Sequence, residues 1–553
     1  MSKPDRELNL DSISTLADAL FYWARKTPDA PAWWTERDGR LQPTSWKEME
    51  QATIFFANAL LEKQETVPSV TTDGGSSISG HELFADRVVS YIPNGFEWAI
   101  VDLACQMLGL IHVPIDRRIP ASELGDYRSR MRPVSVVQSR EEVADEIQQR
   151  LASPRKDDVA EFSTLPRSAV ATILFTSGTS RRPEGVMLSH HNLIHNAWAK
   201  LEAVPQLPTD RRLNILPLAH AYARTCELST WLLSGSSMLC VSSYEQMLSV
   251  APHYQPTLIN GVPSIFEKLK QDILTSSEER RRDRDRLQAL LGNSLRILAA
   301  GGAGLSVSVF SFFEKLGLPI IQGYGLTEAS PVICSNRVTD PKADCVGPPV
   351  RDTEIMTDDE DRLFVRGPGL MLGYWDNPQA TADRIRNGWL DTGDRAKRLP
   401  DGTLRILGRC DDRIVLTTGN KLDPLEIEQQ LIQIASVEHI VLAGHREKFL
   451  SAIVVTNVMD EQALLEKFQQ TLVEWPDYAI PKRLVLVRND WSVESGMLNP
   501  KGAVIRLAVM ERFRLDIGRL YYPSLGRRQE SLEPSQGQQD ASPTQQNRDG
   551  IQQ

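Results

Sequence analysis

Strand-like and helix-like segments alternate through most of the first 350 residues. This alternation constrains the fold more than any other feature of the sequence. Residues 88–92 are predicted to form a strand, a helix follows through Met107, and the next strand is expected at residues 111–115. Such alternation predicts an α/β fold in which layers of helices pack on sheets. Over residues 16–63, apolar residues at helical spacing instead predict a helix, a turn and a second helix.

The chain has 553 residues, so two or more domains are expected rather than a single hydrophobic core. We expect a large, multi-layered N-terminal domain over residues 1–409. Shorter strand–helix units follow and predict a small α+β domain over residues 410–525. Residues 526–553 are polar and rich in Gln, which predicts a disordered tail.

Composition excludes several classes of protein. The net charge of −10 argues against a general nucleic-acid binder. Six scattered cysteines without a C-x-x-C pair argue against a zinc site or a disulfide framework and fit a reducing cytosol. No apolar run is long enough to predict a transmembrane helix, and the first residues contain no apolar stretch of a secretory signal. A cytoplasmic location is therefore expected, while peripheral contact with a membrane stays open.

The first segment with chemical meaning follows an apolar, strand-like run and reads Thr-Ser-Gly-Thr-Ser at residues 176–180. Hydroxyl groups beside a glycine suit a turn in which backbone N–H and side-chain O–H groups surround phosphate oxygens. No Gly-Lys-Ser/Thr follows, so this is not the common P-loop. Taken alone, the segment favours an ordinary turn between two elements. Its candidate nucleotide-binding residues are Thr176, Ser177, Gly178, Thr179 and Ser180.

The second segment, residues 321–330, reads IQGYGLTEAS. Thr327 offers a hydroxyl for a phosphate oxygen, Glu328 a carboxylate for Mg²⁺, and Tyr324 an aromatic face for a base. The alternative is a strand end followed by a helix start, with Thr327 as its cap. A glycine-rich stretch upstream, at residues 298–305, permits close approach of the backbone to a ligand. The candidate nucleotide-binding residues of both stretches are Gly301, Gly302, Ala303, Gly323, Tyr324, Gly325 and Thr327.

Two further segments complete the set. In GWLDTGDRA, residues 388–396, Asp394 follows a glycine in a predicted tight turn, where its carboxylate suits the two hydroxyls of a ribose. In the fourth segment, residues 407–428, Arg409 and Asp411 lie where the large domain is predicted to end. Each of these two segments is weak evidence when taken alone.

In this order and at these distances, the four segments resemble the adenylate-forming superfamily of acyl-CoA synthetases, luciferases and peptide-synthetase adenylation domains. The resemblance covers roughly residues 12–520. Residues 216–224 (LPLAHAYAR) and residues 504–521 are similar to the acyl-site segment and the C-terminal helix of long-chain fatty acid–CoA ligases. The resemblance implies the adenylate-forming fold, in which a small, mobile C-terminal domain rotates and Asp411 holds the hinge position.

The resemblance also implies a two-step reaction that uses ATP and Mg²⁺. A carboxylate, expected to be a fatty acid, attacks the α-phosphate to give acyl-AMP and pyrophosphate. A thiol of CoA, or of a carrier-protein phosphopantetheine, then displaces AMP. The resemblance assigns Mg²⁺ to Glu328, nucleotide contacts to Arg409, and a place at the acyl pocket to His220. We expect His220 to position a group rather than act as a general base; the alternative is a structural histidine.

The chain departs from the family pattern at two places. The family's phosphate loop reads T-S-G-T-T-G-x-P-K-G, and here Ser180, Arg181 and Glu184 replace the second Thr, the Gly and the Lys. Either the loop lysine is dispensable, or Arg181 or Arg182 supplies the positive charge, for which arginine is well suited.

The second departure concerns the family's C-terminal pattern L-T-P-T-x-K-x-x-R, which reads LNPKGAVIR at residues 498–506. Ala503 stands at the lysine position, and Lys501 lies two residues earlier. We expect Lys501 to act as the catalytic lysine because its long stem can reach the same point; otherwise adenylation is impaired. Three functions follow: a fatty acyl-CoA synthetase, an acyl–carrier-protein synthetase or acyl-AMP ligase, and a catalytically weak acyl-adenylate binder.

Overall fold

A computed structural model of the chain describes residues 8–65, 86–153, 165–176, 183–274, 280–488, 491–492, 495–498 and 503–522. The chain divides into two compact units. The first runs to Arg413 and includes residues 491–505, and the second contains residues 414–490 and those from 506 on. The predicted boundary, after residue 409, lies close to this division. Outside the described residues lie Ser177, Gly178, Thr179, Ser180, Arg181, Arg182, Lys501 and the predicted tail, residues 526–553.

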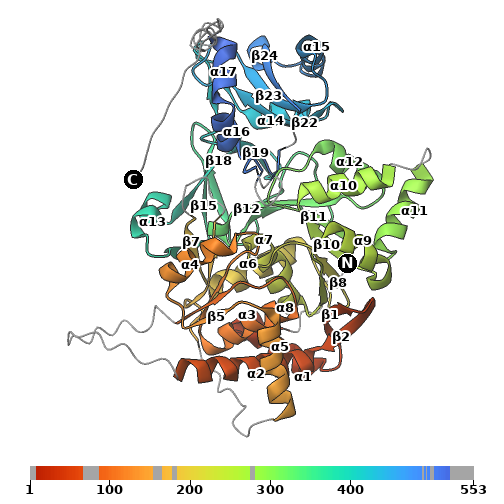
Figure 1. Ribbon diagram of the computed structural model, residues 1–553, viewed down its shortest axis with the longest axis vertical. Coiled ribbons are helices and arrows are strands. Elements are labelled where there is room, and N and C mark those ends of the chain that lie inside the picture. The colour runs from red at the N-terminus through yellow and green to blue at the C-terminus, as the bar shows by residue number, and fades with distance from the viewer. Residues whose placement is uncertain are drawn as a thin grey trace, which may run out of the picture. The chain divides into compact units, whose positions relative to one another are not determined.

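The first unit contains an eight-stranded sheet in which the strands from β12 to β1 run parallel and the two edge strands, β13 and β2, run antiparallel (Figure 1). Its strands, in spatial order, are β13 (Val332–Ser335), β12 (Ile320–Gly325), β11 (Ile297–Ala300), β10 (Leu258–Gly261), β8 (Arg211–Asn214), β9 (Ser237–Cys240), β1 (Pro31–Arg37) and β2 (Arg40–Ser45). Successive residues of β10 point to opposite faces of the sheet, and here they belong to different apolar clusters, Leu258 to one and Ile259 to the other. Both faces of this sheet are therefore covered.

A second, six-stranded sheet contains the strands predicted at residues 88–92 and 111–115. Its order is β16 (Gly373–Tyr374), β7 (Gly185–Ser189), β6 (Val170–Phe175), β4 (Ile111–Pro114), β3 (Arg87–Ser90) and β5 (Ser135–Val137). Val88 and Val89 are both fully buried and lie in different apolar clusters, as expected for a parallel strand covered on both faces. The predicted alternation of strand and helix at residues 88–115 is therefore confirmed.

One part of the early chain differs from its prediction. Residues 16–63 were predicted as two helices joined by a turn, but a β-hairpin of β1 and β2 separates helix α1 (Leu16–Lys26) from α2 (Trp46–Glu65). The hairpin forms because Trp33 is buried against Trp231, with ring centroids 5.5 Å apart, and β1 extends the eight-stranded sheet. Tertiary packing thus overrides the helical spacing.

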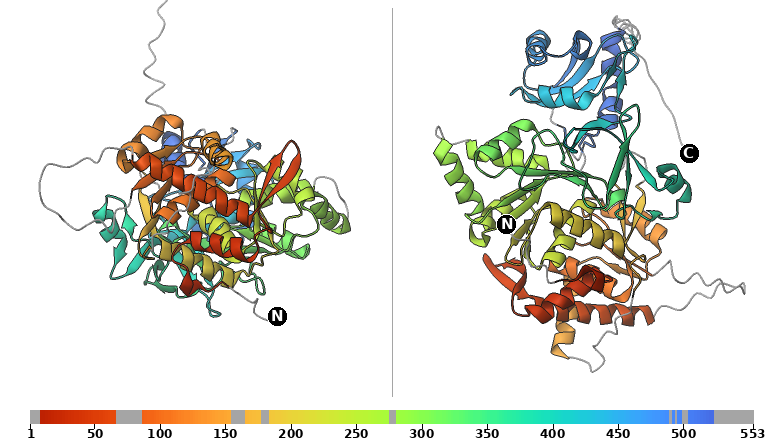
Figure 2. Two further views of the ribbon diagram at one scale, coloured as in Figure 1. Left: turned by 90° about the horizontal axis from the view of Figure 1, so that it is seen from below. Right: turned by 180° about the vertical axis from the view of Figure 1, so that it is seen from behind.

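Helices cover both sheets of the first unit. Figures 1 and 2 show the red and orange helices of the N-terminal part gathered on one side and the green helices α10, α11 and α12 on another. The remaining helices are α3 (Phe96–Leu108), α4 (Leu124–Met131), α5 (Arg140–Ala152), α6 (His190–Ala203), α7 (Ala221–Ala223), α8 (Thr230–Ser234), α9 (Tyr244–Tyr254), α10 (Pro263–Leu274), α11 (Arg280–Leu291) and α12 (Val307–Lys315). Helix α6 packs against both sheets and lies between them. Its Leu193 belongs to the apolar cluster of the six-stranded sheet, and its Ala203 belongs to a cluster of the eight-stranded sheet.

The last part of the first unit is a five-stranded antiparallel sheet that carries two of the predicted site residues. It contains β14 (Glu354–Thr357), β15 (Arg362–Arg366), β17 (Ile385–Arg386), β18 (Trp389–Arg398) and β19 (Leu404–Arg409). Helix α13 (Pro378–Arg384) leads into β17.

The second unit has its own apolar core. Its elements are β20 (Ile414–Val415), β21 (Lys421–Leu422), α14 (Pro424–Leu431), β22 (Val437–Ala443), β23 (Ser451–Thr456), α15 (Glu461–Thr471), β24 (Arg483–Val487), α16 (Arg506–Arg512) and α17 (Arg514–Tyr521). This mixture of short helices and strands is the α+β composition predicted for the small domain. Across the described residues, no helix is both long and apolar enough to cross a membrane. All six cysteines are free.

Candidate active site

Asp394 lies at the centre of a polar cluster formed by three of the predicted residues. Its Oδ2 accepts a hydrogen bond from the Tyr324 hydroxyl at 2.5 Å, and its Oδ1 accepts one from Arg409 Nη1 at 2.9 Å. Tyr324 comes from β12, whereas Asp394 and Arg409 are cross-strand partners on β18 and β19. The structure thus brings together side chains that the sequence places 70 residues apart.

The predicted tight turn at Asp394 is wrong, because this residue lies within the ten-residue strand β18. The preceding Gly393 has a φ of +70°, which a glycine adopts at little cost, and the pairing register shifts between Arg395 and Ala396, where β19 contains one extra residue. A bulge in a strand re-aims the side chains next to it. The aspartate is therefore presented from a paired strand beside a bulge in β19, and the pairing holds it more rigidly than a loop would.

The Asp394 carboxylate acts on the two groups that donate to it. Burial, followed by the Asp394 charge, raises the pKa of the Tyr324 hydroxyl well above its usual value, so Tyr324 remains a donor. Burial lowers the pKa of Arg409, but Asp394 outweighs it and the net shift is upward. A carboxylate has about four acceptor positions. Because Tyr324 and Arg409 use one on each oxygen, acceptor capacity remains for both hydroxyls of a ribose.

Glu328 is buried directly after Thr327, in the 3₁₀-helix η4 (Thr327–Ala329). Its Oε1 accepts a hydrogen bond from the Tyr374 hydroxyl at 2.8 Å, which fixes the orientation of the carboxylate. Among the described residues, no three His, Cys, Asp or Glu side chains come together to hold a metal ion. A single oriented carboxylate nevertheless fits Mg²⁺, which usually binds one or two carboxylates together with substrate phosphates.

The neighbours of Glu328 are shaped by close backbone packing. A side chain at Gly325 would place its Cβ 1.7 Å from the Pro331 carbonyl oxygen, and one at Gly323 would lie 3.3 Å from the Cys334 oxygen. Thr327 is not the helix cap, since Leu326 holds that position. The Thr327 hydroxyl makes no hydrogen bond within the part of the chain that the structure describes, so it is available for a ligand.

The predicted phosphate loop connects β6 to β7. The Thr176 N–H donates to the Glu184 carbonyl at 3.0 Å and closes the base of this loop. The Glu184 side chain accepts a hydrogen bond from Asn377 Nδ2 at 3.1 Å. Asn377 is also the N-cap of α13. Glu184 therefore contacts α13, and no local sequence pattern predicts this contact.

The glycine-rich segment after β11 is contacted by Tyr222, which was not among the predicted site residues. A Cβ at Gly301 would lie 2.9 Å from the Tyr222 ring, so only glycine permits this packing. Gly302 and Ala303 are exposed, and Gly302 has a φ of +82°. Tyr222 lies two residues after His220. The presence of an aromatic residue within LPLAHAYAR was the sequence feature that could have identified it as a site residue.

His220 begins the helical segment α7, where it holds the N-cap position. Its Nε2 lies 2.5 Å from Asp116 Oδ2, and Arg118 Nη2 donates to the same oxygen at 2.6 Å. Burial of Asp116 is outweighed by these two partners, which hold the pKa of its carboxyl well below the usual range. A histidine paired in this way is suited to positioning a group, and that role of His220 stays a prediction.

A cavity of about 420 Å³ opens beside this cluster. Its walls combine aromatic and apolar side chains with three arginines; the residues that matter here are Trp33, Phe96, Trp98, Arg117, Arg118 and Arg140. Asp116 and Ala219, on either side of the His220 contact, also line it. An apolar wall with a few convergent polar groups is the usual composition of a ligand pocket.

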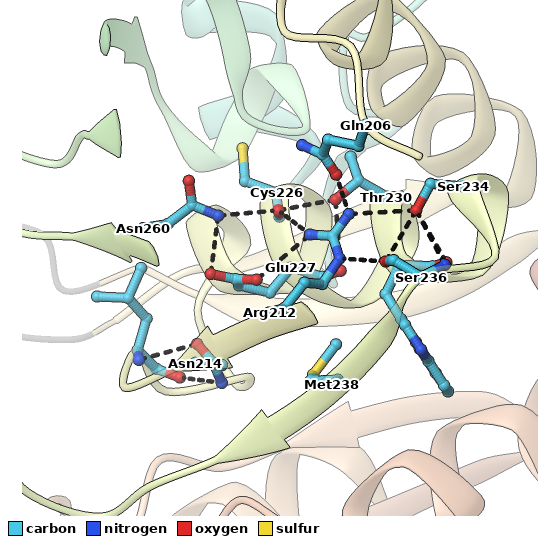
Figure 3. A network of polar contacts seen from close by, with 12 residues as sticks. Gln206, Arg212, Asn214, Cys226, Glu227, Thr230, Ser234, Ser236, Met238 and Asn260 are labelled. Carbon is cyan, nitrogen blue, oxygen red and sulfur yellow. Dashed lines mark hydrogen bonds and ion pairs between the residues drawn. The ribbon is translucent and has the colours of Figure 1, made fainter. Parts of the chain in front are cut away.

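The helical segment after His220 continues as a π-helix, η3 (Arg224–Ser229), before α8. Buried ion pairs hold it from two sides. Arg224 Nη2 lies 2.8 Å from Asp102 Oδ1 of α3, and Glu227 Oε2 lies 3.4 Å from Arg212 Nη1 of β8. Figure 3 shows the second pair, with Asn260 of β10 donating to Glu227 Oε1 at 2.7 Å. Short π-helices occur often at functional sites.

The π-helix also contacts the Glu328 segment. The Thr225 hydroxyl donates to the Ser330 carbonyl at 2.6 Å, two residues beyond Glu328. One continuous segment therefore links His220, Tyr222 and the segment that carries Glu328. The charged side chains of the π-helix, Arg224 and Glu227, are buried, and buried charges need partners to be tolerated in the interior.

The remaining predicted residues lie near the division between the units. Asp411 is exposed in a turn that follows β19, two residues before Arg413, where the first unit ends. Ala503 is half-buried in the stretch 491–505 that groups with the first unit.

Comparison with known families now gives these observations a context. Residues 84–375 match the family of AMP-binding enzymes, and residues 411–524 match the AMP-binding enzyme C-terminal domain. Long-chain-fatty-acid–CoA ligase FadD15 of Mycobacterium bovis is 26% identical, with 79% of this chain and 88% of the relative covered. The chloroplastic long-chain-fatty-acid–acyl-carrier-protein ligase AEE15 of Arabidopsis thaliana is 27% identical, with 64% of this chain and 61% of the relative covered.

The solved structure of ATP-bound MatB from Rhodopseudomonas palustris superimposes with a TM-score of 0.73, covering 90% of this chain and 99% of that chain at 21% identity. At this identity the likeness shows the fold, and the predicted adenylate-forming α/β fold is confirmed. The first family match spans more than half of the chain. The chain therefore belongs to the adenylate-forming superfamily of AMP-binding enzymes and is close to its long-chain fatty acid–CoA ligases.

Proposed function

We propose that the protein is an ATP-dependent fatty acyl-CoA synthetase. The observation that carries this proposal is the cluster of Tyr324, Asp394 and Arg409, together with the oriented Glu328 carboxylate. Asp394 would bind the ribose hydroxyls. Thr176, Thr327, Gly301, Gly302 and the other predicted glycines would surround the nucleotide.

In the first step a carboxylate attacks an anionic α-phosphate, so the site must offset negative charge. Glu328 would hold Mg²⁺, which supplies charge neutralisation at the phosphates when it is bound. Lys501 would approach the reacting groups from the C-terminal part of the chain, and Asp411 would serve as the hinge for that movement. His220 would position the acid through its contact with Asp116.

The cavity beside His220 supports a substrate that combines an apolar body with negative charge. A fatty acid and the pantetheine arm of CoA both have this character. Long-chain-fatty-acid–CoA ligases among the relatives favour the fatty acid and CoA as substrates. The cytoplasm is the compartment we propose, because the six cysteines are free and both ATP and CoA are available there.

A carrier protein is the alternative thiol acceptor, and the name of the Arabidopsis relative supports it. The test is acid-dependent release of pyrophosphate from ATP with a panel of acids of increasing chain length, followed by product analysis with CoA or with a phosphopantetheinylated carrier protein. We expect release with long-chain acids and an acyl-CoA product. Pyrophosphate release without any thioester to CoA would favour the carrier protein. No release with any acid would leave a weak acyl-adenylate binder.

A further inference from the structure

Two guanidinium groups converge on one backbone carbonyl beside the Asp394 cluster. Arg384 Nη2 donates to the Thr392 carbonyl at 3.1 Å, and Arg409 Nη1 lies 3.3 Å from the same oxygen. Both groups also flank Gly393: a Cβ at this residue would lie 2.9 Å from Arg409 Nη2 and 3.1 Å from Arg384 Nη1. Gly393 leaves the space between the two cations open.

The two cations differ in how their charge is compensated. Arg409 is paired with the Asp394 carboxylate. For Arg384, the structure records no ion pair with a carboxylate of the described residues. Two like charges this close repel each other. Burial raises the pKa of Asp391, but its partner Arg362 and then the charge of Arg384 lower it, so Asp391 is shared between two cations. The three arginines therefore exceed the carboxylates of Asp394 and Asp391 by one charge. The local excess of positive charge favours an anion at this position.

Arg384 also acts on the other end of the site. It is the last residue of α13, and this helix follows β16, which carries Tyr374. Burial and the neighbouring Glu328 raise the pKa of the Tyr374 hydroxyl, and the Arg384 cation opposes this shift. Tyr374 is the residue that orients Glu328. Arg384 therefore lies between the carboxylate assigned to the ribose and the carboxylate assigned to Mg²⁺.

A nucleoside triphosphate that spans these two carboxylates passes its phosphates through the space between them. We propose that Arg384 binds the polyphosphate of ATP and supplies a positive charge there. A planar guanidinium has five N–H donors, and the bond to Thr392 uses one of them. Such a group suits bidentate contact with phosphate oxygens. This inference rests on the nucleotide site proposed above.

The competing explanation is that Arg384 only anchors α13 to β18 through Thr392. The two roles separate when ligands with and without phosphates are compared. We expect Arg384→Gln to raise the KM for ATP about tenfold, as for loss of a charge-assisted hydrogen bond. The affinity for adenosine, measured as a competitive inhibitor, should stay unchanged. Arg384→Met should give the same pattern and replaces the Gln variant if that protein does not fold.

Arg386 provides a matched control two residues away. Its side chain is 75% exposed and lies 4.0 Å from Asp383, at the surface. Arg386→Gln removes the same charge from the same segment and should leave both affinities at their wild-type values. Thermal unfolding of all variants checks that the fold is retained.

Each outcome decides the question. Equal losses for adenosine and ATP would show that Arg384 merely holds β18, and unchanged ATP affinity would show that it contacts no phosphate. A loss in Arg386→Gln as large as that in Arg384→Gln would reduce the effect to net charge; these results all overturn the proposal. A wild-type chain that binds neither ATP nor adenosine would instead refute the nucleotide site itself.

Discussion

Arg409 Nη1 donates a hydrogen bond to Asp394 Oδ1 at 2.9 Å across two paired strands. The strand pairing sets the distance between their backbones, and Tyr324 of β12 donates to the other oxygen of the same carboxylate. A carboxylate held by two donors loses little conformational freedom when a ligand binds. This preorganisation is the structural basis for the ribose site.

Asp394→Asn should weaken the binding of both adenosine and ATP. The amide can accept on one side only, so at least one charge-assisted bond to a ribose hydroxyl is lost, and each is worth about 1.5–3 kcal/mol. The measurement is the affinity of the two ligands, and Tyr324→Phe, which removes one supporting donor, should have a smaller effect. Wild-type affinities in Asp394→Asn would mean that this residue only supports the strand.

Glu328→Gln should abolish acid-dependent pyrophosphate release while leaving the thermal unfolding temperature nearly unchanged. The glutamine oxygen can still accept the bond from Tyr374, which preserves packing, but a neutral amide is a poor ligand for Mg²⁺. Release is measured over a range of Mg²⁺ concentrations. A rate close to that of the wild type would refute the assignment of the metal to Glu328.

Thr225→Val should impair the first reaction step because the buried hydroxyl bonds the Ser330 carbonyl, next to the Glu328 segment. Loss of one buried hydrogen bond is worth about 1 kcal/mol, so we expect the KM for ATP to rise about fivefold. Thr230→Val is the matched control. Its hydroxyl is equally buried but bonds Cys226, within the same helical segment, at 2.7 Å.

Both threonine variants should lose similar stability in chemical denaturation, and only the first should change the kinetics. Thr225→Ser keeps a hydroxyl and should restore the KM. If Thr225→Val and Thr230→Val raise the KM for ATP equally, the effect comes from a general loss of stability in the helical segment and not from the hydrogen bond to the Ser330 carbonyl.

Glu227 should make stability depend on pH. Burial raises the pKa of its carboxyl to about 7 despite the Arg212 partner, so the folded chain holds this proton more tightly than the unfolded chain does. The resulting stabilisation is complete below the unfolded pKa, near 4.5, and is lost as the pH rises through about 7.

The free energy of unfolding of the wild type, relative to Glu227→Gln, should therefore decrease between pH 5 and pH 7 and level off above. Chemical denaturation of both proteins across this range measures the difference. A difference that grows with pH would show that the Arg212 charge outweighs burial.

Lys501→Ala should slow acyl-AMP formation by orders of magnitude and spare thioester formation from supplied acyl-AMP, because only the first step brings a carboxylate toward an anionic phosphate. Ala503→Lys, which restores the family spacing, should rescue part of the loss in the Lys501→Ala background. Single-turnover assays separate the two steps. Equal rates of adenylation with and without Lys501 would assign the charge to another group.

The sequence by itself determined the elements that local patterns encode. The strands at residues 88–92 and 111–115 were predictable because buried parallel strands consist of short apolar runs between turn signals. The order of the four polar segments identified the superfamily, and with it the fold. Asp394, Tyr324 and Glu328 were named as candidates because each carries chemistry that a nucleotide requires, and Arg409 was named through the family resemblance.

The tertiary structure alone decided how these candidates are held. The hairpin of β1 and β2 depends on burial of Trp33 against Trp231, almost 200 residues further along the chain. Asp394 lies on a strand rather than in a turn because β19 pairs with it.

Tyr374 and Arg384 had no motif of their own, and Tyr222 lies in a motif from which only His220 was singled out. Packing places Tyr374, Arg384 and Tyr222 beside Glu328, Gly393 and Gly301, respectively. Residue type and spacing are local properties that a sequence displays. The partner that orients a carboxylate, or the cation that lies beside it, depends on distances between segments far apart in the chain. These distances exist only once the sheets have paired and the core has closed.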